Sequence, residues 1–296
     1  MFDARSFIEK TIISLKDEIE GNAIAACSGG VDSTTAAMLA YRAIGGKLKV
    51  AYIDDGFRRE NEAEETLELL KTLFPHVIYI NAQDTFYKNL KGIRDAEEKR
   101  KIFRETFYSI LSEVAKKEKA GYLVQGTIKA DIDETVKRIK SQHNVLEQIG
   151  ISTQKYGFKL VEPLKDLYKP QVRMVARQLG LPKEISEKIP FPGPGLMIRV
   201  QGEISPEKIE IVRRANKIIE EEVKDLEFFQ AFAVLLEGKT TGTKDGKRVY
   251  GYSIALRIVD SEDALTAKAK EVPFELLKKI ASRITSEIPK VNRVFY

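Results

Sequence analysis

The segment Ser28-Gly-Gly-Val-Asp-Ser-Thr34 has the residue types and the spacing of a phosphate-binding loop. It follows a short apolar run, Asn22 to Cys27, and leads into an alanine-rich stretch, Asp32 to Ala43, that predicts a helix. Two glycines let the backbone turn tightly and come close to a ligand. The N–H groups and the positive dipole at a helix start attract anions. The loop is therefore predicted to hold phosphate groups.

The side chains of this loop suit the same chemistry. The hydroxyls of Ser28, Ser33 and Thr34 can donate hydrogen bonds, and the carboxylate of Asp32 can hold Mg²⁺ on the same phosphates. We expect Asp32 and Ser33 to take part in catalysis as well. The residues expected to contact ATP or pyrophosphate here are Ser28, Gly29, Gly30, Val31, Asp32, Ser33 and Thr34.

Three better-known loops do not fit the sequence. The Walker A pattern and the dinucleotide fingerprint are both absent from this segment. A nucleophile elbow needs a glycine two residues before the serine, and Ala26 occupies that position. This disfavours a serine hydrolase that uses Ser28 and His143, which stays as one alternative. A glycine-rich turn without function is another.

The loop, placed after a first strand, resembles the pyrophosphate loop of the N-type ATP pyrophosphatases. Members of that group adenylate a substrate oxygen with release of pyrophosphate, and a nitrogen or sulfur nucleophile then displaces AMP. Four further segments resemble motifs of the GMP synthetase family within this group, with Asp55 standing where that family commonly has Asn. They are Ile53 to Glu62, Val124 to Ile128 with Asp131 and Glu134, Lys140 to Val145, and Phe191 to Leu196.

The resemblance implies a set of site residues. Asp54 and Gly126 are expected at the ATP site, and Lys140 is expected to be a catalytic lysine on a lid that closes over the phosphates. The residues expected to bind the purine nucleotide XMP are Arg59, Arg199, Gln230 and His143. Arg58 is an alternative to Arg59, and either arginine could be a solvated charge.

Asp131 and Glu134 are spaced three residues apart, so on a helix they share a face. Together with Asp32 they could complete a Mg²⁺ site. The alternative is that the two carboxylates cap a helix.

The resemblance implies that XMP, ATP and ammonia are converted to GMP, AMP and pyrophosphate, with Mg²⁺ as the cofactor. Only 27 residues precede Ser28, so we expect no amidotransferase domain there and a separate glutaminase subunit as the source of ammonia. The family usually ends in a Lys/Pro-rich tail that is thought to contact the nucleotide. The sequence stops at Tyr296, so part of the substrate site is expected to be either missing or unresolved here.

A tRNA-thiolating enzyme is a rival that the pI of about 9.0 would suit. Those enzymes generally depend on reactive cysteines outside the loop, whereas Cys27 is the single cysteine here and lies beside it. We therefore expect no nucleic-acid partner. One cysteine also favours the reducing cytoplasm.

The elements around the loop alternate between strands and helices, which predicts an α/β parallel sheet with helices on both faces. The resemblance implies that this is the adenine nucleotide alpha hydrolase-like fold. Ligands in such sheets bind beyond the carboxyl ends of the strands. The predicted elements are helix 3–20, strand 22–27, helix 32–43, strand 49–54, helix 61–73, strand 76–80, helix 95–119 and strand 121–125.

The proline-rich stretch Ile189 to Gly195 separates a second region. We expect an ATP pyrophosphatase domain over residues 1–188 and a smaller α+β dimerisation and substrate domain over 189–296. Its predicted elements are strand 196–202, helix 206–223, strands 228–236 and 249–259, helix 273–286 and strand 291–295. One face of strand 249–259, formed by Tyr250, Tyr252, Ile254, Leu256 and Ile258, is expected to support a homodimer.

The composition agrees with a globular enzyme of one large or two ordinary domains. The chain has 296 residues, of which 43% are hydrophobic and 31% charged, and its net charge is +5. These values exclude wholesale disorder and permit an anionic substrate without requiring nucleic acid. No apolar run is long enough to cross a bilayer, and the first residues lack the pattern of a signal peptide.

Overall fold

The computed structural model describes residues 2–136, 156–188, 191–244, 246–261 and 266–296. They form two compact units, each of which is described by itself. The first unit contains residues 1–55, 64–82 and 103–193, and the second contains 56–63, 83–102 and 194–296. The segment Gly56–Ala63 thus groups with the C-terminal residues. The functional boundary expected at 188/189 stays a prediction.

A five-stranded sheet forms the centre of the first unit, in the order β3-β2-β1-β4-β5. Every neighbouring pair is parallel. The chain moves outward from β1 to β3 and then returns to the other side of β1, so the strand order reverses between β1 and β4. Ligands bind at such a point in open α/β sheets. The strands are β1 (Asn22–Ala26), β2 (Leu48–Asp54), β3 (Val77–Asn81), β4 (Ala120–Val124) and β5 (Lys159–Val161).

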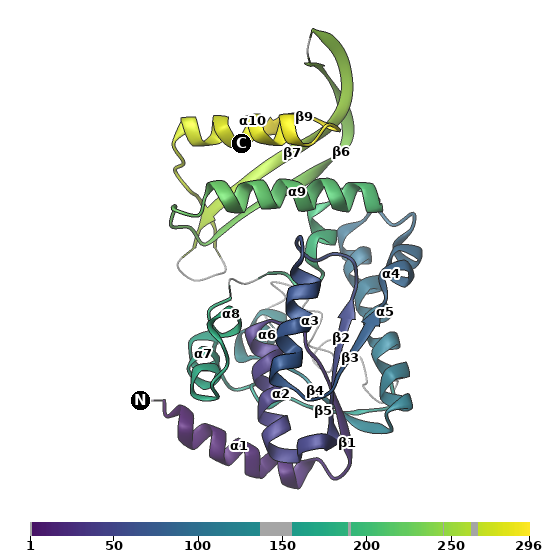
Figure 1. Cartoon of the computed structure of the whole chain (residues 1–296), viewed down its shortest axis with the longest axis vertical. Helices are drawn as coiled ribbons and strands as arrows, with labels where there is room; N and C mark the ends of the chain where they lie inside the picture. Colours follow the sequence, from purple (N-terminus) through teal and green to yellow (C-terminus); the bar gives the residue numbers. More distant parts are fainter. Residues whose placement is uncertain (1, 137–155, 189–190, 245, 262–265) are drawn as a thin grey trace. The chain divides into compact units, whose positions relative to one another are not determined.

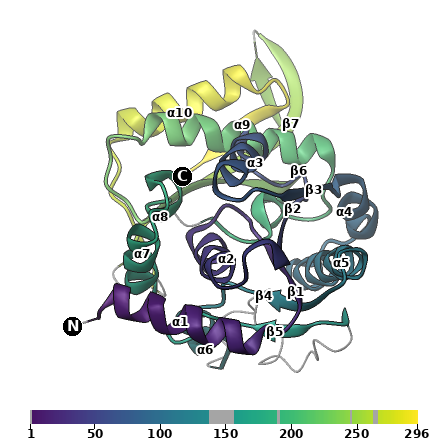
Figure 2. The same cartoon turned by 60° about the horizontal axis from the view of Figure 1, so that its bottom comes forward.

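Helices cover both faces of this sheet, as predicted. Figure 2 shows α1, α2 and α7 on one side of the strands and α5 on the other. The reversal of strand order explains this, since right-handed crossovers in opposite directions put their helices on opposite faces. The helices in this part of the sequence are α1 (Ala4–Glu18), α2 (Val31–Ile44), α3 (Glu62–Leu73), α4 (Gln83–Leu90), α5 (Ala96–Lys117), α6 (Lys129–Val136), α7 (Lys169–Gln178) and α8 (Lys183–Ser186), of which α4 and the first residues of α3 and α5 belong to the second unit.

The predicted elements from residue 3 to residue 125 are all present, with ends that differ by a few residues. The sequence analysis did not predict α4, α6, β5, α7 or α8. These are short elements of three to ten residues, too short for a clear periodic pattern. No helix in the described part of the chain is both long enough and apolar enough to span a bilayer.

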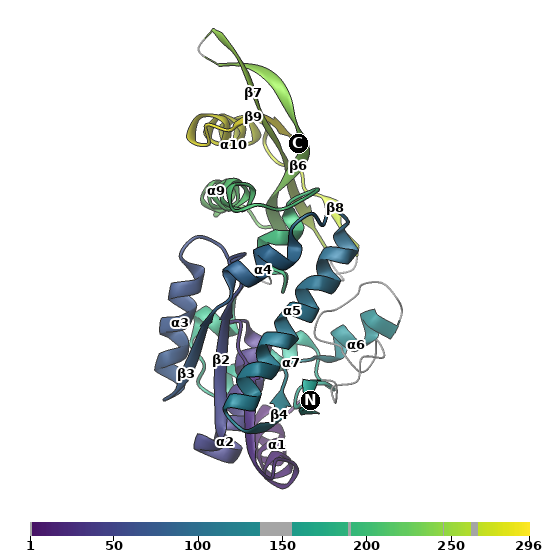
Figure 3. The same cartoon turned by 90° about the vertical axis from the view of Figure 1, so that its right-hand side faces the viewer.

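The second unit is an α+β structure built on a long hairpin (Figure 1). Strand β6 (Gln230–Lys244) pairs antiparallel with β7 (Lys247–Asp260), which also pairs with the short β8 (Lys268–Ala269) and in parallel with β9 (Val291–Phe295). Helices α9 (Pro206–Glu222) and α10 (Phe274–Glu287) lie together on one side of this sheet (Figure 3). The predicted helices 206–223 and 273–286 and the last three predicted strands are thereby confirmed.

The strand predicted at 196–202 is wrong. Residues Gly195–Arg199 form a 3-10 helix, η4. Gly195 has φ +61°, and a Cβ at this position would lie 2.3 Å from the carbonyl oxygen of Phe57. The next N–H, of Leu196, donates to that oxygen at 2.7 Å. This contact turns the chain away from a strand. Within residues 196–202, Val200 alone forms strand-like pairing, a parallel bridge with Leu235.

The apolar face expected on strand 249–259 is not open as predicted. Ile254 is completely buried and Ile258 is 9% exposed within this unit. Tyr250 is 68% exposed and is the large apolar side chain of this set that faces solvent most. The two isoleucines belong to the core of the unit, because this part of the sheet packs against the unit's own helices.

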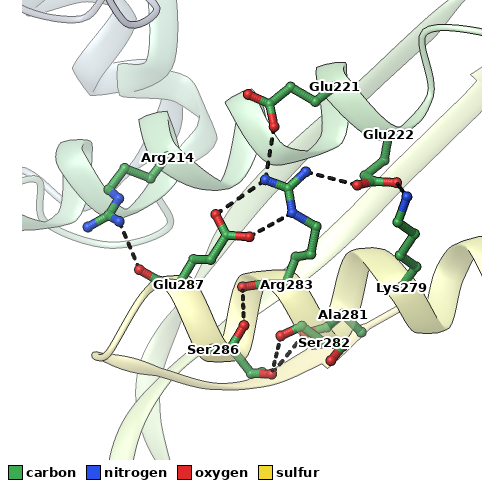
Figure 4. A network of polar contacts seen from close by, with 10 residues as sticks. Arg214, Glu221, Glu222, Lys279, Ala281, Ser282, Arg283, Ser286 and Glu287 are labelled. Atoms are coloured by element: carbon green, nitrogen blue, oxygen red, sulfur yellow. Dashed lines mark hydrogen bonds and ion pairs between the residues drawn. The ribbon is translucent and has the colours of Figure 1, made fainter.

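A network of charged residues joins α9 to α10 (Figure 4). The Arg283 guanidinium donates to Glu222 at 2.8 Å and to Glu287 at 2.6 Å, and it pairs with Glu221 at 2.9 Å. Lys279 lies 2.7 Å from Glu222, whose side chain is only 8% exposed. Hydrogen bonds from Lys279 and Arg283 lower the pKa of Glu222, and the bond from Arg283 lowers the pKa of Glu287.

These pKa shifts predict a loss of stability in acid. A carboxylate whose pKa is lower in the folded protein stabilises the fold above its unfolded pKa, ordinarily 4.5, and this stabilisation disappears as the pH falls through the folded value. We expect Glu222→Gln to lower the Tm by a few degrees at about pH 7 and by much less at about pH 3.

Glu275→Gln is the matched control, because Glu275 pairs with Lys278 on the same helix with both side chains exposed. Exposed pairs contribute little, so this variant should keep the wild-type Tm at both pH values. Thermal unfolding of the wild type, Glu222→Gln and Glu275→Gln at both pH values measures these Tm differences. An equal Tm decrease for Glu222→Gln at both pH values would contradict the role of the network.

Candidate functional site

Two tight contacts lie at the start of α2. A side chain packs against Gly29, and Gly126 packs against the backbone of the helix itself. Gly29 has φ +71°, and a Cβ there would lie 2.5 Å from Cγ2 of Thr66 in α3. There is no room for a side chain at Gly126, after β4, either. A Cβ added there would lie 2.6 Å from the backbone C of Asp32 and the backbone N of Ser33. The glycines therefore fix the position of this helix start within the first unit.

The loop residues bond to one another and leave the helix start open to an anion. Ser28 N–H donates to Ser33 Oγ at 3.3 Å, the two serine hydroxyls lie 3.3 Å apart, and Ser33 Oγ donates to Gly30 O. The hydrogen-bond ladder of α2 begins with Thr34 N–H donating to Gly30 O at 3.1 Å. The N–H groups before it have no acceptor within the helix, which is the arrangement that binds phosphates.

Asp32 has a partner that the sequence analysis missed. Lys169 Nζ donates to Asp32 Oδ2, and the two residues are 137 positions apart in the sequence. The other oxygen, Asp32 Oδ1, is buried and has no hydrogen-bond partner among the described residues. The structure thus brings one cation and one carboxylate to the loop.

Lys169 is itself held in place by its neighbours. It is the first residue of α7, and the hydroxyl of the preceding Tyr168 donates to Asp133 Oδ2 in α6 at 3.0 Å. Lys129 N–H donates to Leu167 O at 2.9 Å. A cation in the first turn of a helix opposes the helix dipole. That unfavourable position, beside Pro170, is the signal by which Lys169 could have been found.

Asp54 ends β2 and is 4% exposed. Its Oδ2 accepts a hydrogen bond from the Tyr79 hydroxyl on β3 at 3.1 Å. Burial and this bond raise the pKa of Tyr79. The carboxylate is thus positioned at the carboxyl end of a strand next to β1, and its nucleotide role stays a prediction.

Thr34 is fully buried, which places its hydroxyl inside the unit.

The Gln-Gly-Thr segment after β4 is fixed by side chains on both sides. Gln125 accepts from the Tyr108 hydroxyl at 2.7 Å and donates to Thr127 Oγ1 at 3.0 Å. Asp131 Oδ2 accepts from the N–H of Ile128 at 3.1 Å, which is helix capping, the alternative weighed from the sequence. The Glu134 side chain lies outside the described part.

A metal site would need a group of at least three His, Cys, Asp or Glu side chains. Among the described residues there is no such group. The predicted set Asp32, Asp131 and Glu134 therefore stays a prediction. Lys140 and His143 lie outside the described residues, so their predicted roles also stay predictions.

Cys27 is a buried thiol beside the loop. It is 2% exposed, and its Sγ lies 3.7 Å from the Ser33 carbonyl oxygen as a hydrogen-bond donor. Burial raises the pKa of this thiol to about 12. The group therefore stays protonated at neutral pH and is a poor nucleophile.

The predicted nucleotide-binding residues of the second unit gather near one face of β6. The Arg199 guanidinium lies 3.2 Å from the centre of the Phe232 ring. Gln230 is two residues from Phe232 and therefore on the same face of the strand. Arg257 is the register partner of Phe232 on β7 and shares that face too. The sequence signal for Arg257 was a lone charge in the apolar run Ser253–Val259.

Arg199 lies in a strongly positive environment. Burial, followed by the charges of Arg257, Arg100 and Arg59, lowers the pKa of Arg199 to about 10. Its Nε is buried without a hydrogen-bond partner in the described residues. The end of η4 is held by Lys99, which is 2% exposed and donates to Val200 O at 2.8 Å. Such a group of guanidiniums suits an anionic ligand.

Arg59 is brought to the same unit with its own counter-ion. Its side-chain Nε lies 3.0 Å from Glu220 Oε1. Its backbone N–H donates to Glu62 Oε2 at 3.1 Å. Burial raises the pKa of Glu220, and the charge of Arg59 acts in the opposite direction. The ion pair with Glu220 thus orients the Arg59 side chain within the second unit.

Comparison with known proteins finds two matching families and full-length relatives. Residues 216–296 match the family described as GMP synthase C terminal domain, and residues 5–196 match the NAD synthase family. A protein of Methanopyrus kandleri, named as one subunit of a glutamine-hydrolyzing GMP synthase, is 50% identical over 100% of this chain and 96% of its own length. The chain belongs to this family of GMP synthase subunits. A family member from Pyrococcus furiosus is likewise 50% identical, over 98% of this chain and 93% of its own length.

A solved structure supports the fold of this GMP synthase family member. The NMN synthetase of Francisella tularensis superposes with a TM-score of 0.52 and 19% identity, covering 71% of this chain and 85% of that one. At this identity the likeness concerns the fold alone.

The close packing at Gly126 makes a prediction about the loop. A methyl group at residue 126 must push the first turn of α2 away, so Gly126→Ala should weaken Mg·ATP binding by at least about tenfold and destabilise the protein by about 1–3 kcal/mol. Calorimetric titration with Mg·ATP and thermal unfolding measure the two effects.

Gly121→Ala is the matched control, because it lies on β4 and a Cβ there meets nothing within 4 Å. This variant should bind Mg·ATP as the wild type does. Wild-type affinity and Tm in Gly126→Ala would show that the helix start is not fixed by this contact.

Proposed function

We propose that this chain is the synthetase subunit of a two-subunit GMP synthase. It converts XMP, ATP and ammonia into GMP, AMP and pyrophosphate. The observation that carries the proposal is the open start of α2 with Asp32 and Lys169 beside it, in a chain of this family. A second support is the group of arginines around Arg199.

The loop after β1 binds the β- and γ-phosphates of ATP. The backbone N–H groups at the start of α2 and the hydroxyls of Ser28 and Ser33 donate to phosphate oxygens. Lys169 is close enough to Asp32 to place its positive charge at the same phosphates. These donors stabilise the charge that pyrophosphate gains as it leaves.

The residues at the loop fit a magnesium ion in part. Asp32 Oδ1 is a buried carboxylate oxygen that lacks a hydrogen-bond partner in the described region, and a hard cation would satisfy it. Asp32 would therefore hold Mg²⁺, with Asp131 and Glu134 as the further ligands. The ion would neutralise phosphate charge when it is bound together with ATP.

The arginines of the second unit bind XMP. Arg59, Arg199 and Gln230 supply donors for the phosphate and the polar groups of the nucleotide, and His143 is a further contact. Arg257 and Arg100 add positive charge close to Arg199. Repulsion among these guanidiniums is relieved when a phosphate dianion enters, so binding should be favourable and salt-dependent.

The reaction has two steps. The O2 oxygen of XMP attacks the α-phosphorus of ATP, and the bond to the bridging oxygen breaks as pyrophosphate leaves. Ammonia then attacks C2 of the adenyl-XMP, and AMP leaves with the O2 oxygen. Lys140 acts in the first step, in which its positive charge neutralises charge on the phosphates.

The ammonia comes from a separate glutaminase subunit. Glutamine hydrolysis of the amidotransferase kind needs a cysteine thiolate, and the thiol of Cys27, with its pKa of about 12, cannot supply one at neutral pH. The synthetase acts in the cytoplasm.

We also propose that the synthetase subunit is a homodimer formed through residues after about 195. Tyr250, Phe295 and Tyr296 are exposed by 68%, 45% and 59% in the second unit, which leaves aromatic surface for a second copy.

An acceptor assay tests the proposed reaction. The isolated chain with Mg·ATP and an ammonium salt should form AMP when XMP is added, and it should form none with deamido-NAD, citrulline or tRNA. Because the thiol of Cys27 stays protonated, glutamine should not replace ammonium until a glutaminase subunit is added. AMP and GMP are measured by chromatography.

Two results would contradict this proposal. AMP formation with another acceptor and none with XMP would change the substrate. Turnover with glutamine in the absence of a partner would remove the need for a glutaminase subunit.

A further inference from the structure

The segment from Gly56 to Arg59, which follows β2, is held through its backbone carbonyls. Three successive carbonyl oxygens accept hydrogen bonds within the second unit. Gly56 O and Arg58 O accept from the Arg213 side chain at 2.8 Å and 2.9 Å, and Phe57 O accepts from Leu196 N–H at 2.7 Å. The backbone that leads to Arg59 is therefore fixed at every residue.

Arg213 makes two of these bonds with one rigid group. Its Nε and Nη2 donate to carbonyls two residues apart, while Nη1 donates to Glu210 Oε2 at 2.6 Å. Every nitrogen of the guanidinium has an acceptor, and the side chain is 21% exposed. Three of its five N–H groups are therefore used within this unit, two of them on the segment. A planar fork of this kind cannot be reproduced by a lysine ammonium.

The same face of α9 also holds the side chains of the segment. Lys217 lies 2.5 Å from Glu60, and Glu220 lies 3.0 Å from Nε of Arg59. Residues 213, 217 and 220 are spaced by four and three, so they form one stripe on the helix. The helix thus fixes the backbone with Arg213 and orients Arg59 with Glu220.

We infer that Arg213 is a positioning residue for the nucleotide substrate, because it fixes the backbone that presents Arg59 to the nucleotide phosphate. The inference rests on the proposed function, in which Arg59 binds XMP. It adds that α9, which carries no predicted substrate contact, determines the affinity for XMP but not for ATP.

Steady-state kinetics of Arg213→Ala and Arg213→Lys test the inference. Loss of two charge-assisted hydrogen bonds to a substrate-binding loop should raise the KM for XMP by about tenfold. The KM for ATP should stay within about twofold, because the ATP-binding loop belongs to the other unit. Arg213→Lys should keep the wild-type Tm but not restore the KM for XMP, since one ammonium cannot replace the fork.

Arg214→Ala is the matched control. Arg214 is the next residue of α9, and its Nη2 donates to Glu287 O at 2.9 Å, away from the segment. This variant should keep the wild-type KM for both substrates. In an Arg59→Ala background, Arg213→Ala should raise the KM for XMP by less than about twofold, because the residue it positions is gone.

Three outcomes would overturn the inference: equal increases in both KM values, full rescue by lysine, or the same tenfold effect in the Arg59→Ala background. Hydrogen exchange separates this from failure of the proposed function. If the wild type does not use XMP, the proposed reaction is wrong. Even then, Arg213→Ala should speed exchange of the amides of residues 56–60 and Arg214→Ala should not. Unchanged exchange in Arg213→Ala would refute the positioning role by itself.

Discussion

The first unit depends on the absence of side-chain atoms at two glycines beside the start of α2. At Gly29 a Cβ would collide with Thr66, and at Gly126 it would collide with the backbone of Asp32 and Ser33. Neither collision could be relieved by rotating a flexible side-chain end, because the first contact is a packed, β-branched residue and the second is backbone. The helix start is therefore in place before any ligand binds, and its N–H groups do not need to be reorganised. Preorganised dipoles of this kind are the main source of electrostatic stabilisation in enzymes.

Charge is arranged differently in the two units. At the phosphate loop, the cation Lys169 is paired with Asp32, so the site carries balanced charge until phosphates arrive. In the second unit, burial and then the charges of three other arginines lower the pKa of Arg199, whose buried Nε has no hydrogen-bond partner in the described residues. The negative charge of an anion would relieve that repulsion. Each unit thus favours an anion for its own physical reason.

The sequence was informative at the loop and the central strands, where the determinants are local. The alternation of apolar runs and helical patterns predicted the parallel sheet, and the two glycines before Asp32 predicted the tight turn into a helix that the structure has. The sequence could not show that Lys169 meets Asp32, because 137 residues separate them. Arg213 and Gly56 are 157 residues apart, and their contact has no local pattern at all.

Local patterns also misled where a distant contact decided the backbone. The stretch 196–202 is apolar enough to predict a strand, yet the carbonyl of Phe57 binds the N–H of Leu196 and turns the chain into a 3-10 helix. For the same reason, the alternation in strand 249–259 could not tell which of its residues the helices of the unit would bury. At Asp131 the spacing allowed helix capping or metal binding, and the structure shows a capping bond to the N–H of Ile128, while the metal role stays a prediction.

The proposed reaction depends on transfer of the adenylyl group of ATP to the O2 oxygen of XMP, with release of pyrophosphate. Turnover of XMP labelled with oxygen-18 at O2, followed by mass spectrometry of the products, tests this directly. If O2 attacks the α-phosphorus, the C2–O2 bond breaks in the amination step and the label leaves in the phosphate of AMP. AMP without the label, or labelled phosphate released together with ADP, would contradict adenylation at O2.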